Sequence, residues 1–127
     1  MKSDSKSVKY ILESTSDVLF PDEVNYRHVE INSVGTGGDT PLHVLAWKKD
    51  KDGIETLINA GADVNAIGEL DETPLHIAIT NKKIKIIELL LSAGADVNIK
   101  CEIGDTPLER AKKKGGNIAK LFKYYCT

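Results

Sequence analysis

The feature that most limits how this chain can fold is an internal repeat with a period of 33 residues. The tripeptide Thr-Pro-Leu occupies 40–42, 73–75 and 106–108, and the pentapeptide Gly-Ala-Asp-Val-Asn occupies 61–65 and 94–98. Two different motifs that share one period are typical of a solenoid, in which each unit packs against its neighbours in the sequence. At 127 residues the chain suits a single domain, which the period predicts to be a stack of such units.

Within one unit the apolar pattern predicts two helices and a connecting loop. Pro74 suits the first position of a helix, and the hydroxyl of Thr73 can cap the free N–H groups behind it. We expect the second helix to end at Gly94 in a left-handed conformation and to bury one stripe, formed by Ile86, Ile87, Leu90 and Leu91. In the first full repeat the segment 49–53 departs from this pattern, so we expect an irregular turn there and a short helix after it.

The register divides the chain into four units. Residues 1–34 are predicted to form a degenerate N-terminal capping unit, 35–67 and 68–100 two full repeats, and 101–127 a C-terminal capping repeat. In the first unit we expect a helix over about 5–13 and another that begins at Pro21. The last unit has Glu109 where the others have histidine, and its many lysines suit an end that no further unit covers.

The combination of Thr-Pro-Leu-His with Gly-Ala-Asp-Val-Asn at this period resembles the ankyrin repeat, over about residues 28–125. The resemblance implies an all-α ankyrin-repeat solenoid of stacked helix-turn-helix units with short β-hairpin-like tips. It also implies a protein–protein interaction module, because this family binds many unrelated proteins and is not known for catalysis. In this family the position of Trp47, which is equivalent to Thr80 and Lys113, faces the concave groove.

No motif in the sequence predicts catalysis, a metal or a cofactor. His43 and His76 belong to the repeat signature, where the resemblance implies that the imidazole holds turn backbone near the preceding threonine. No His/Cys cluster has zinc spacing. The acidic segment 50–53 lacks the other ligands of a calcium loop, and the glycine-rich segment 35–38 lacks the ending of a phosphate-binding loop. We therefore expect a protein that is not an enzyme and has no small-molecule substrate.

Charge and hydropathy limit the location and the partners of the chain. Its 17 Lys+Arg and 19 Asp+Glu give a formal net charge of −2, which disfavours a strongly basic nucleic-acid binder. No apolar run approaches the ~20 residues needed to span a bilayer. We expect a small, stand-alone, soluble cytoplasmic protein that is monomeric, since a stack with polar ends has no need to dimerise. Cys101 and Cys126 are too few for a disulfide framework and are predicted to be free thiols.

The register places acidic and basic residues on different edges of the stack. The three tips carry acids and no base: Asp39, Glu69, Asp71, Glu72, Glu102 and Asp105. The turns between paired helices carry nine lysines, diluted only by Asp50 and Asp52; the lysines are Lys48, Lys49, Lys51, Lys82, Lys83, Lys85, Lys112, Lys113 and Lys114. Leu70 and Ile103 occupy matching tip positions, where solvated side chains are normally polar. The near-neutral net charge therefore conceals a strong segregation.

These surface features predict a docking site for a basic protein partner, which opposite potentials would steer to the acidic tips. The candidate partner-binding residues are Asp39, Trp47, Glu69, Leu70, Glu72, Thr80, Glu102, Ile103 and Asp105. The Lys- and Ile-rich composition and small size also resemble bacterial ankyrin proteins, some of which are immunity proteins. One hypothesis is therefore an antitoxin that occupies the phosphate-gripping surface of a basic, nuclease-like toxin.

Two other functions stay open at this point. A scaffold or regulatory adaptor would use the same groove for several partners. A nucleic-acid or anionic-surface binder would use the lysine-rich turns, although the acidic tips and the lack of aromatic residues among the lysines disfavour it. Trp47 is open in a similar way: it either anchors a partner, which we favour, or packs over the turn that follows it.

Overall fold

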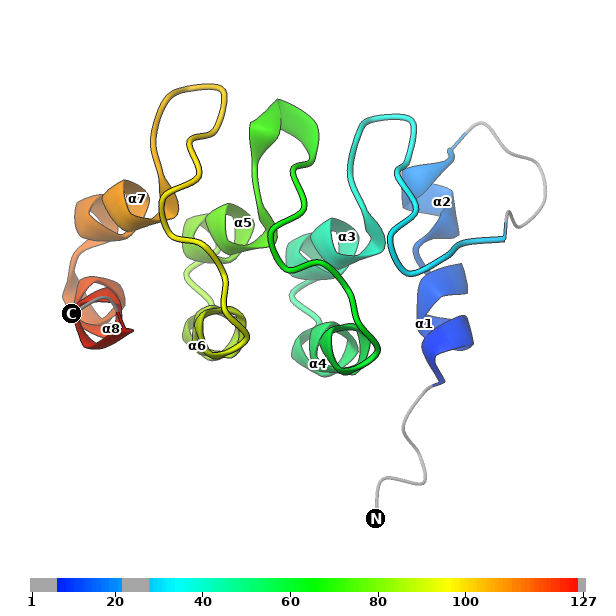
Figure 1. The fold of residues 1–127 in the computed structure, drawn as a ribbon, viewed down its shortest axis with the longest axis horizontal. Coiled ribbons are helices and arrows are strands. Elements are labelled where there is room, and N and C mark those ends of the chain that lie inside the picture. The colour runs from blue at the N-terminus through cyan, green and yellow to red at the C-terminus, as the bar shows by residue number, and fades with distance from the viewer. Residues whose placement is uncertain (1–6, 22–27, 126–127) are drawn as a thin grey trace, which may run out of the picture.

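The structure is a computed structural model that describes residues 7–21 and 28–125. Most of its helices form two parallel rows, and loops project from one side of them (Figure 1). The first row consists of α3 (Pro41–Lys48), α5 (Pro74–Thr80) and α7 (Pro107–Lys114). The second row consists of α4 (Lys51–Asn59), α6 (Ile84–Ser92) and α8 (Gly116–Tyr125). The described residues thus form the all-α solenoid that the sequence predicts.

Two short helices cover the N-terminal end of the stack. α1 (Val8–Glu13) packs against α4, and α2 (Ser16–Leu19) packs against α3. The Ser7 hydroxyl starts α1 by accepting the N–H of Tyr10 at 3.1 Å. The sequence analysis expected the second helix to begin at Pro21, but the structure shows α2 ending before this proline. A helix after Pro21 would lie outside the described residues.

Each helix of the first row starts from a capping box. In the second repeat the Thr73 N–H donates to His76 Nδ1 at 3.1 Å, and the His76 N–H donates to Thr73 Oγ1 at 3.3 Å. The two bonds satisfy backbone donors that the helix itself leaves free. At the other end of each repeat, Gly61 and Gly94 follow α4 and α6 with φ of 102° and 93°. This left-handed ending, which glycine adopts without a steric penalty, confirms the predicted helix stop.

The turn between α3 and α4 is regular, and the helix after it is of full length. Lys49 has a φ of 61° and Lys82, at the equivalent position, a φ of 57°. α4 and α6 both span nine residues. The prediction of an irregular turn and a short helix is therefore wrong. Its physical reason is the cap: Asp50 accepts the Gly53 N–H at 2.9 Å and so starts α4 despite the unusual sequence.

The tips are hairpin-shaped loops, and no strand occurs in the described part of the chain. One backbone hydrogen bond closes each tip across four residues. The donors and acceptors are Gly35 N–H to Asp39 O at 2.8 Å, Gly68 N–H to Glu72 O at 2.8 Å and Cys101 N–H to Asp105 O at 3.0 Å. A short 3₁₀ turn over Glu69–Asp71 forms the end of the second tip.

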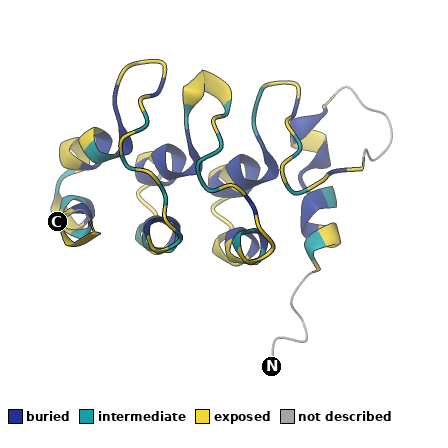
Figure 2. Cartoon of the chain, viewed as in Figure 1, coloured by how far each residue is buried: buried dark blue, intermediate teal, exposed yellow. Residues whose placement is uncertain are grey.

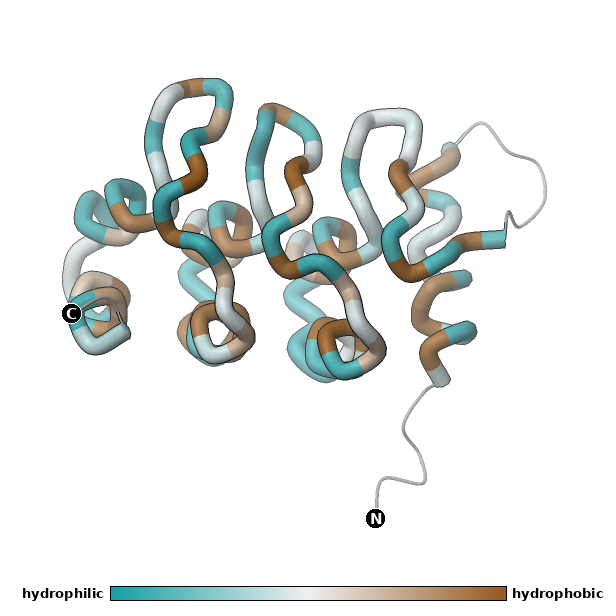
Figure 3. Tube along the Cα trace, in the orientation of Figure 1, coloured by the Kyte–Doolittle hydropathy of each residue, from teal (hydrophilic) through white to brown (hydrophobic). Residues whose placement is uncertain are grey.

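The apolar core runs between the two rows of helices, and the surfaces that face outward or project as loops are largely exposed (Figure 2). Leu45, Leu57, Leu75, Ile87 and Leu90 are fully buried in it. Burial of a side chain of this size contributes about 1.5–3 kcal/mol, so the core supplies most of the drive for stacking. Figure 3 shows hydrophobic stretches on the projecting loops as well as within the helices. On the projecting loops the exposed apolar side chains are Val34, Ile67, Leu70 and Ile103.

Asparagine side chains add a polar ladder between units. Asn32 Oδ1 accepts the Asp63 N–H at 3.2 Å, and Asn65 Oδ1 accepts the Asp96 N–H at 2.7 Å. Each bond joins one unit to the next across 31 residues of sequence. The ladder fixes the relative positions of the loops that lead into successive tips.

Candidate functional site

One histidine in each full repeat, His43 or His76, connects that repeat to the tip of the next unit. His43 Nδ1 accepts the Thr40 N–H at 3.1 Å, and its Nε2 lies 2.8 Å from the carbonyl oxygen of Glu72. His76 makes the equivalent bond from Nε2 to the carbonyl of Asp105 at 3.2 Å. Because Nδ1 accepts a hydrogen bond, Nε2 carries the proton and the ring is neutral. The structure thus gives both histidines the structural role that the resemblance implied.

Burial lowers the pKa of His43 and of His76 below the usual 6.5. In the unfolded chain both rings titrate near that value, so below it the unfolded state binds more protons than the folded state. The free energy of unfolding should therefore be greatest above about pH 7 and fall as the pH decreases toward about 5. Urea denaturation at a series of pH values measures this slope.

The double variant His43→Gln, His76→Gln serves as the control for this pH dependence. Glutamine can complete a capping box but does not titrate. The variant should show a flat stability profile over the same pH range. An unchanged slope would mean that the two buried histidines are not its source.

Glu109 stands in the last unit where the full repeats have histidine, and it keeps the helix-capping function of that histidine. Its Oε1 accepts the Thr106 N–H at 3.0 Å, and its own N–H donates to Thr106 Oγ1 at 3.1 Å. The capping box of α7 is therefore complete. A carboxylate has no proton to donate, so Glu109 cannot make the bond that His43 and His76 make to the tip of a following unit.

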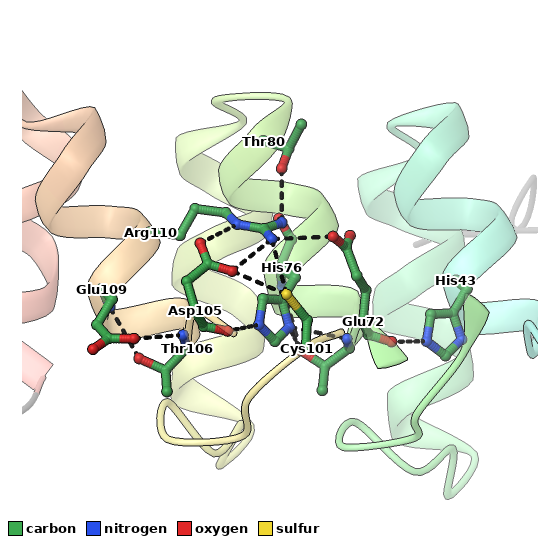
Figure 4. A network of polar contacts seen from close by, with 10 residues as sticks. His43, Glu72, His76, Thr80, Cys101, Asp105, Thr106, Glu109 and Arg110 are labelled. Atoms are coloured by element: carbon green, nitrogen blue, oxygen red, sulfur yellow. Dashed lines mark hydrogen bonds and ion pairs between the residues drawn. The ribbon is translucent and has the colours of Figure 1, made fainter. Parts of the chain in front are cut away.

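The second and third tips meet at a buried guanidinium group (Figure 4). Arg110 Nε and Nη2 donate to the two carboxylate oxygens of Asp105 at 3.0 and 2.9 Å, and Nη2 lies 3.1 Å from Glu72 Oε2. Its Nη1 donates to the carbonyl of His76 at 3.3 Å and to the hydroxyl of Thr80 at 3.0 Å. Arg110 is only 8% exposed. One side chain therefore joins two tips and helix α5.

The charges of this group stabilise each other. The hydrogen bonds from Arg110 hold the pKa of the Asp105 carboxyl far below its usual range. Burial works against the charge of Arg110, but its hydrogen bonds with Asp105 and Glu72 raise the pKa of the guanidinium. The charges of Asp105 and Arg110 are therefore directed at each other and at the Glu72 carboxylate rather than at a partner.

The predicted partner-binding residues fall into two sets. Four of them are bonded within the molecule: Asp39 Oδ1 accepts the Glu69 N–H at 2.8 Å, Glu72 and Asp105 pair with Arg110, and Thr80 accepts from Arg110. The other five are exposed, as is Thr80 of the first set; the five are Trp47, Glu69, Leu70, Glu102 and Ile103. Only three tip acids, Glu69, Asp71 and Glu102, therefore present free carboxylates to a partner. The tips are therefore less acidic toward a partner than a count of their charged residues predicts, because Glu72 and Asp105 have an internal partner.

A hollow of about 420 Å³ opens between the second repeat and the last unit. It is lined by Glu72, Thr80, Ile103, Arg110, Lys113 and Lys114. The hollow thus brings together three of the predicted residues and leaves out Trp47 and Leu70. A second hollow, of about 400 Å³, lies between the third tip and α7, and Ile103 lines it as well.

The three apolar candidates remain open to solvent. Trp47 is 50%, Leu70 58% and Ile103 79% exposed. Leu70 has a φ of 60°, a left-handed conformation that costs a leucine roughly 1–2 kcal/mol. Its carbonyl accepts the Glu102 N–H at 2.9 Å, which links the second tip to the third. The tip backbone thus holds an apolar side chain outward at an energetic cost, a pattern that is typical of binding sites.

Arg110 is the residue that the sequence analysis missed. The 33-residue register aligns it with Val44 and Ile77, both of which are buried and apolar. The same register aligns Asp39, Glu72 and Asp105 at one position. A charged residue that breaks an apolar column, beside a column of acids, was therefore a usable signal for the internal ion pair.

The structure also brings together three possible metal ligands whose spacing in the sequence does not indicate a metal site. Ligand atoms of His76, Cys101 and Asp105 lie within 4.8 Å of one another. Their hydrogen-bonding capacity is already used, since Cys101 Sγ donates to Asp105 Oδ1 at 3.0 Å and His76 bonds the Asp105 carbonyl. The guanidinium of Arg110 lies 3.4 Å from the sulfur and would repel a cation. Cys101 is a free, buried thiol, and Cys126 lies outside the described residues.

Comparisons with known proteins agree with this geometry. A family profile described as "Ankyrin repeat" matches residues 37–69, and one described as "Ankyrin repeats (many copies)" matches residues 57–111. The search of curated proteins finds no match. Among the described helices none has the length and hydropathy to span a membrane. The two matches cover both full repeats and the start of the last unit, so the chain belongs to the ankyrin repeat family, whose repeats form protein–protein interaction modules.

Proposed function

We propose that this module binds a protein partner through its tips, with Leu70 and Ile103 as the main apolar contacts. The observation that carries the proposal is that two large apolar side chains occupy equivalent tip positions and are more than half exposed. Every helix of the stack, by contrast, buries an apolar face. Apolar side chains held in water at repeating positions favour an interaction surface.

The tips are suited to docking because they are ordered before a partner arrives. The Asp39 carboxylate fixes the second tip through the Glu69 N–H, and the Leu70 carbonyl fixes the third tip through the Glu102 N–H. A surface that is already held in place loses little conformational entropy on binding. Trp47, half exposed near the end of α3, is a further aromatic candidate for contact with the partner, although it lies outside the hollow.

The partner proposed from the remaining charge is a basic protein. Glu69, Asp71 and Glu102 favour a cationic surface by electrostatic steering, although more weakly than six acids would. A cytoplasmic immunity protein that neutralises a nuclease-like toxin is the specific form of this proposal, and it rests on these exposed acids. A regulatory adaptor would use the same residues for several partners, so recovery of one stoichiometric protein favours immunity and recovery of a mixture favours the adaptor.

The test is affinity purification of the partner with the full chain, followed by binding measurements on the double variant Leu70→Ser, Ile103→Ser. Each side chain contributes about 1.5–3 kcal/mol when it is buried, so the affinity should fall roughly 100-fold or more. Titration calorimetry with the purified partner measures the loss.

Tyr124→Ser is the matched control, because Tyr124 is also a largely exposed apolar residue but lies on α8, away from the tips. It should bind like the unmodified chain. A second variant, Glu69→Lys with Glu102→Lys, tests the charge of the partner alone. Unchanged affinity in the serine variant would refute the apolar docking site, and unchanged affinity in the lysine variant would refute a basic partner.

A further inference from the structure

The turns between paired helices carry positive charge that the proposed docking site does not use. Nine lysines lie in the turns between paired helices and the adjoining helix ends, and all are exposed: Lys48, Lys49, Lys51, Lys82, Lys83, Lys85, Lys112, Lys113 and Lys114. We call this set the lysine edge. In Figure 4 Thr80, at the turn end of α5, lies at the opposite end of the helix from the tip residues Cys101 and Asp105. The turn after α5 therefore lies away from these tip residues, whereas Lys113 and Lys114 line the same hollow as the tip residue Ile103.

Little negative charge offsets the lysine edge. Lys51 lies 3.9 Å from Glu55, and Lys85 lies 3.8 Å from Glu88, in pairs that are widely exposed to water. Exposed pairs of this kind neutralise charge only weakly. Of the two acids in the turns, Asp50 is engaged by the Gly53 N–H, and Asp52 lies in the first turn of α4. The edge thus keeps a large positive surplus although the whole chain is slightly acidic.

The shape of the edge fits a flat surface. α3, α5 and α7 lie side by side in a nearly straight row, so the turns that follow them also form a row (Figure 1). Neighbouring packed helices are about 8–10 Å apart, which gives a row about 20 Å long. A straight row of charges can contact a plane along its whole length.

The chemistry of the edge points to diffuse charge rather than to specific phosphate recognition. Within the described residues Arg110 is the sole arginine, and it is buried in its ion pairs. Arginine grips phosphates with two parallel hydrogen bonds, whereas lysine acts as a point charge. Clusters of lysine are the usual means of adhering to anionic lipid headgroups.

We propose that the lysine edge binds an anionic phospholipid surface. Each lysine near such a surface contributes about a fivefold gain in partitioning, and the contribution decreases as salt screens it. This activity is separate from protein binding by the tips.

Vesicle co-sedimentation of the full chain tests the proposal. Vesicles of phosphatidylcholine with about 30% phosphatidylserine should bind the chain at low salt, whereas pure phosphatidylcholine vesicles should not. The triple variant Lys82→Glu, Lys83→Glu, Lys85→Glu should lower the partition coefficient roughly 100-fold. Trp47 is the single tryptophan of the chain and borders Lys48, so its fluorescence reports binding independently.

The control variant Lys100→Glu, Lys120→Glu, Lys123→Glu makes the same change in net charge at exposed lysines outside the edge. It should retain most of the vesicle binding. Equal losses in the two triple variants, or equal binding to neutral and anionic vesicles, would overturn the proposal. Tighter binding to a DNA duplex than to anionic vesicles, lost through the same three lysines, would assign the edge to nucleic acid instead. Because the tip variant Leu70→Ser, Ile103→Ser leaves the edge intact, failure of either function is seen separately.

Discussion

Replacing Arg110 with methionine is expected to lower the free energy of unfolding by about 3 kcal/mol. The substitution keeps most of the apolar stem but removes the cation that joins Glu72 and Asp105. Two carboxylates that are nearly excluded from water are then left facing each other without compensation. The hydroxyl of Thr80 and the carbonyl of His76 also lose their donor. Urea denaturation at neutral pH measures the loss.

The triple variant Arg110→Met, Glu72→Gln, Asp105→Asn separates the charge from the rest of the network. Replacing all members of a buried ion cluster is commonly far less costly than removing one, because no uncompensated charge remains. The triple variant should therefore recover most of the stability that Arg110→Met loses. A single variant that loses less than about 1 kcal/mol would show that the guanidinium is hydrated in solution.

Gly35→Ala is expected to destabilise the chain by about 2 kcal/mol. A Cβ at this position would lie 2.6 Å from the carbonyl oxygen of Leu19 and 2.8 Å from its Cα. These are backbone atoms at the end of α2, so no side-chain rotation can relieve the contact. The same region carries the Thr36 N–H bond to the Leu19 carbonyl at 2.9 Å, which the displacement would also disturb.

Gly37→Ala is the matched control, because a Cβ at Gly37 would meet no atom within 4 Å. Its stability should equal that of the unmodified chain or slightly exceed it, since alanine restricts the unfolded state. Thermal denaturation of the two variants side by side gives the comparison. Equal midpoints would contradict the close packing of α2 on the first tip, and with it the proposal that residues 1–34 form an N-terminal capping unit.

The parts of this fold that could be predicted from sequence are those that local chemistry determines. Thr73 and Pro74 start a helix and Gly94 stops one by interactions within a few residues, and the period then multiplies the unit. The irregular turn was predicted wrongly because the cap supplied by Asp50 was not recognised as a substitute for the usual turn residues. Local departures from a repeat can thus be compensated locally.

The electrostatics of the tips could not be predicted from the same local information. Glu72 and Arg110 are 38 positions apart, and neither has an opposite charge at helical spacing that would reveal the pair. Apart from the charge that Arg110 introduces into an apolar column of the register, it is burial and three-dimensional proximity that distinguish an acid held internally from one that faces a partner. The apolar prediction depended less on such detail, and Trp47, Leu70 and Ile103 are indeed exposed. Their role in binding stays a prediction.

The shared guanidinium also bears on how a gene of this kind could gain length by duplication. An extra copy of residues 68–100 would set one Glu72 beside the Ile77 of the following copy, because the arginine belongs to the last unit alone. That acid would be stranded without a counter-ion. A copy of residues 35–67 carries His43 and Asn65, which make the bonds to a following unit, and demands no cation. The array is thus better able to grow by copying its first full repeat than its second.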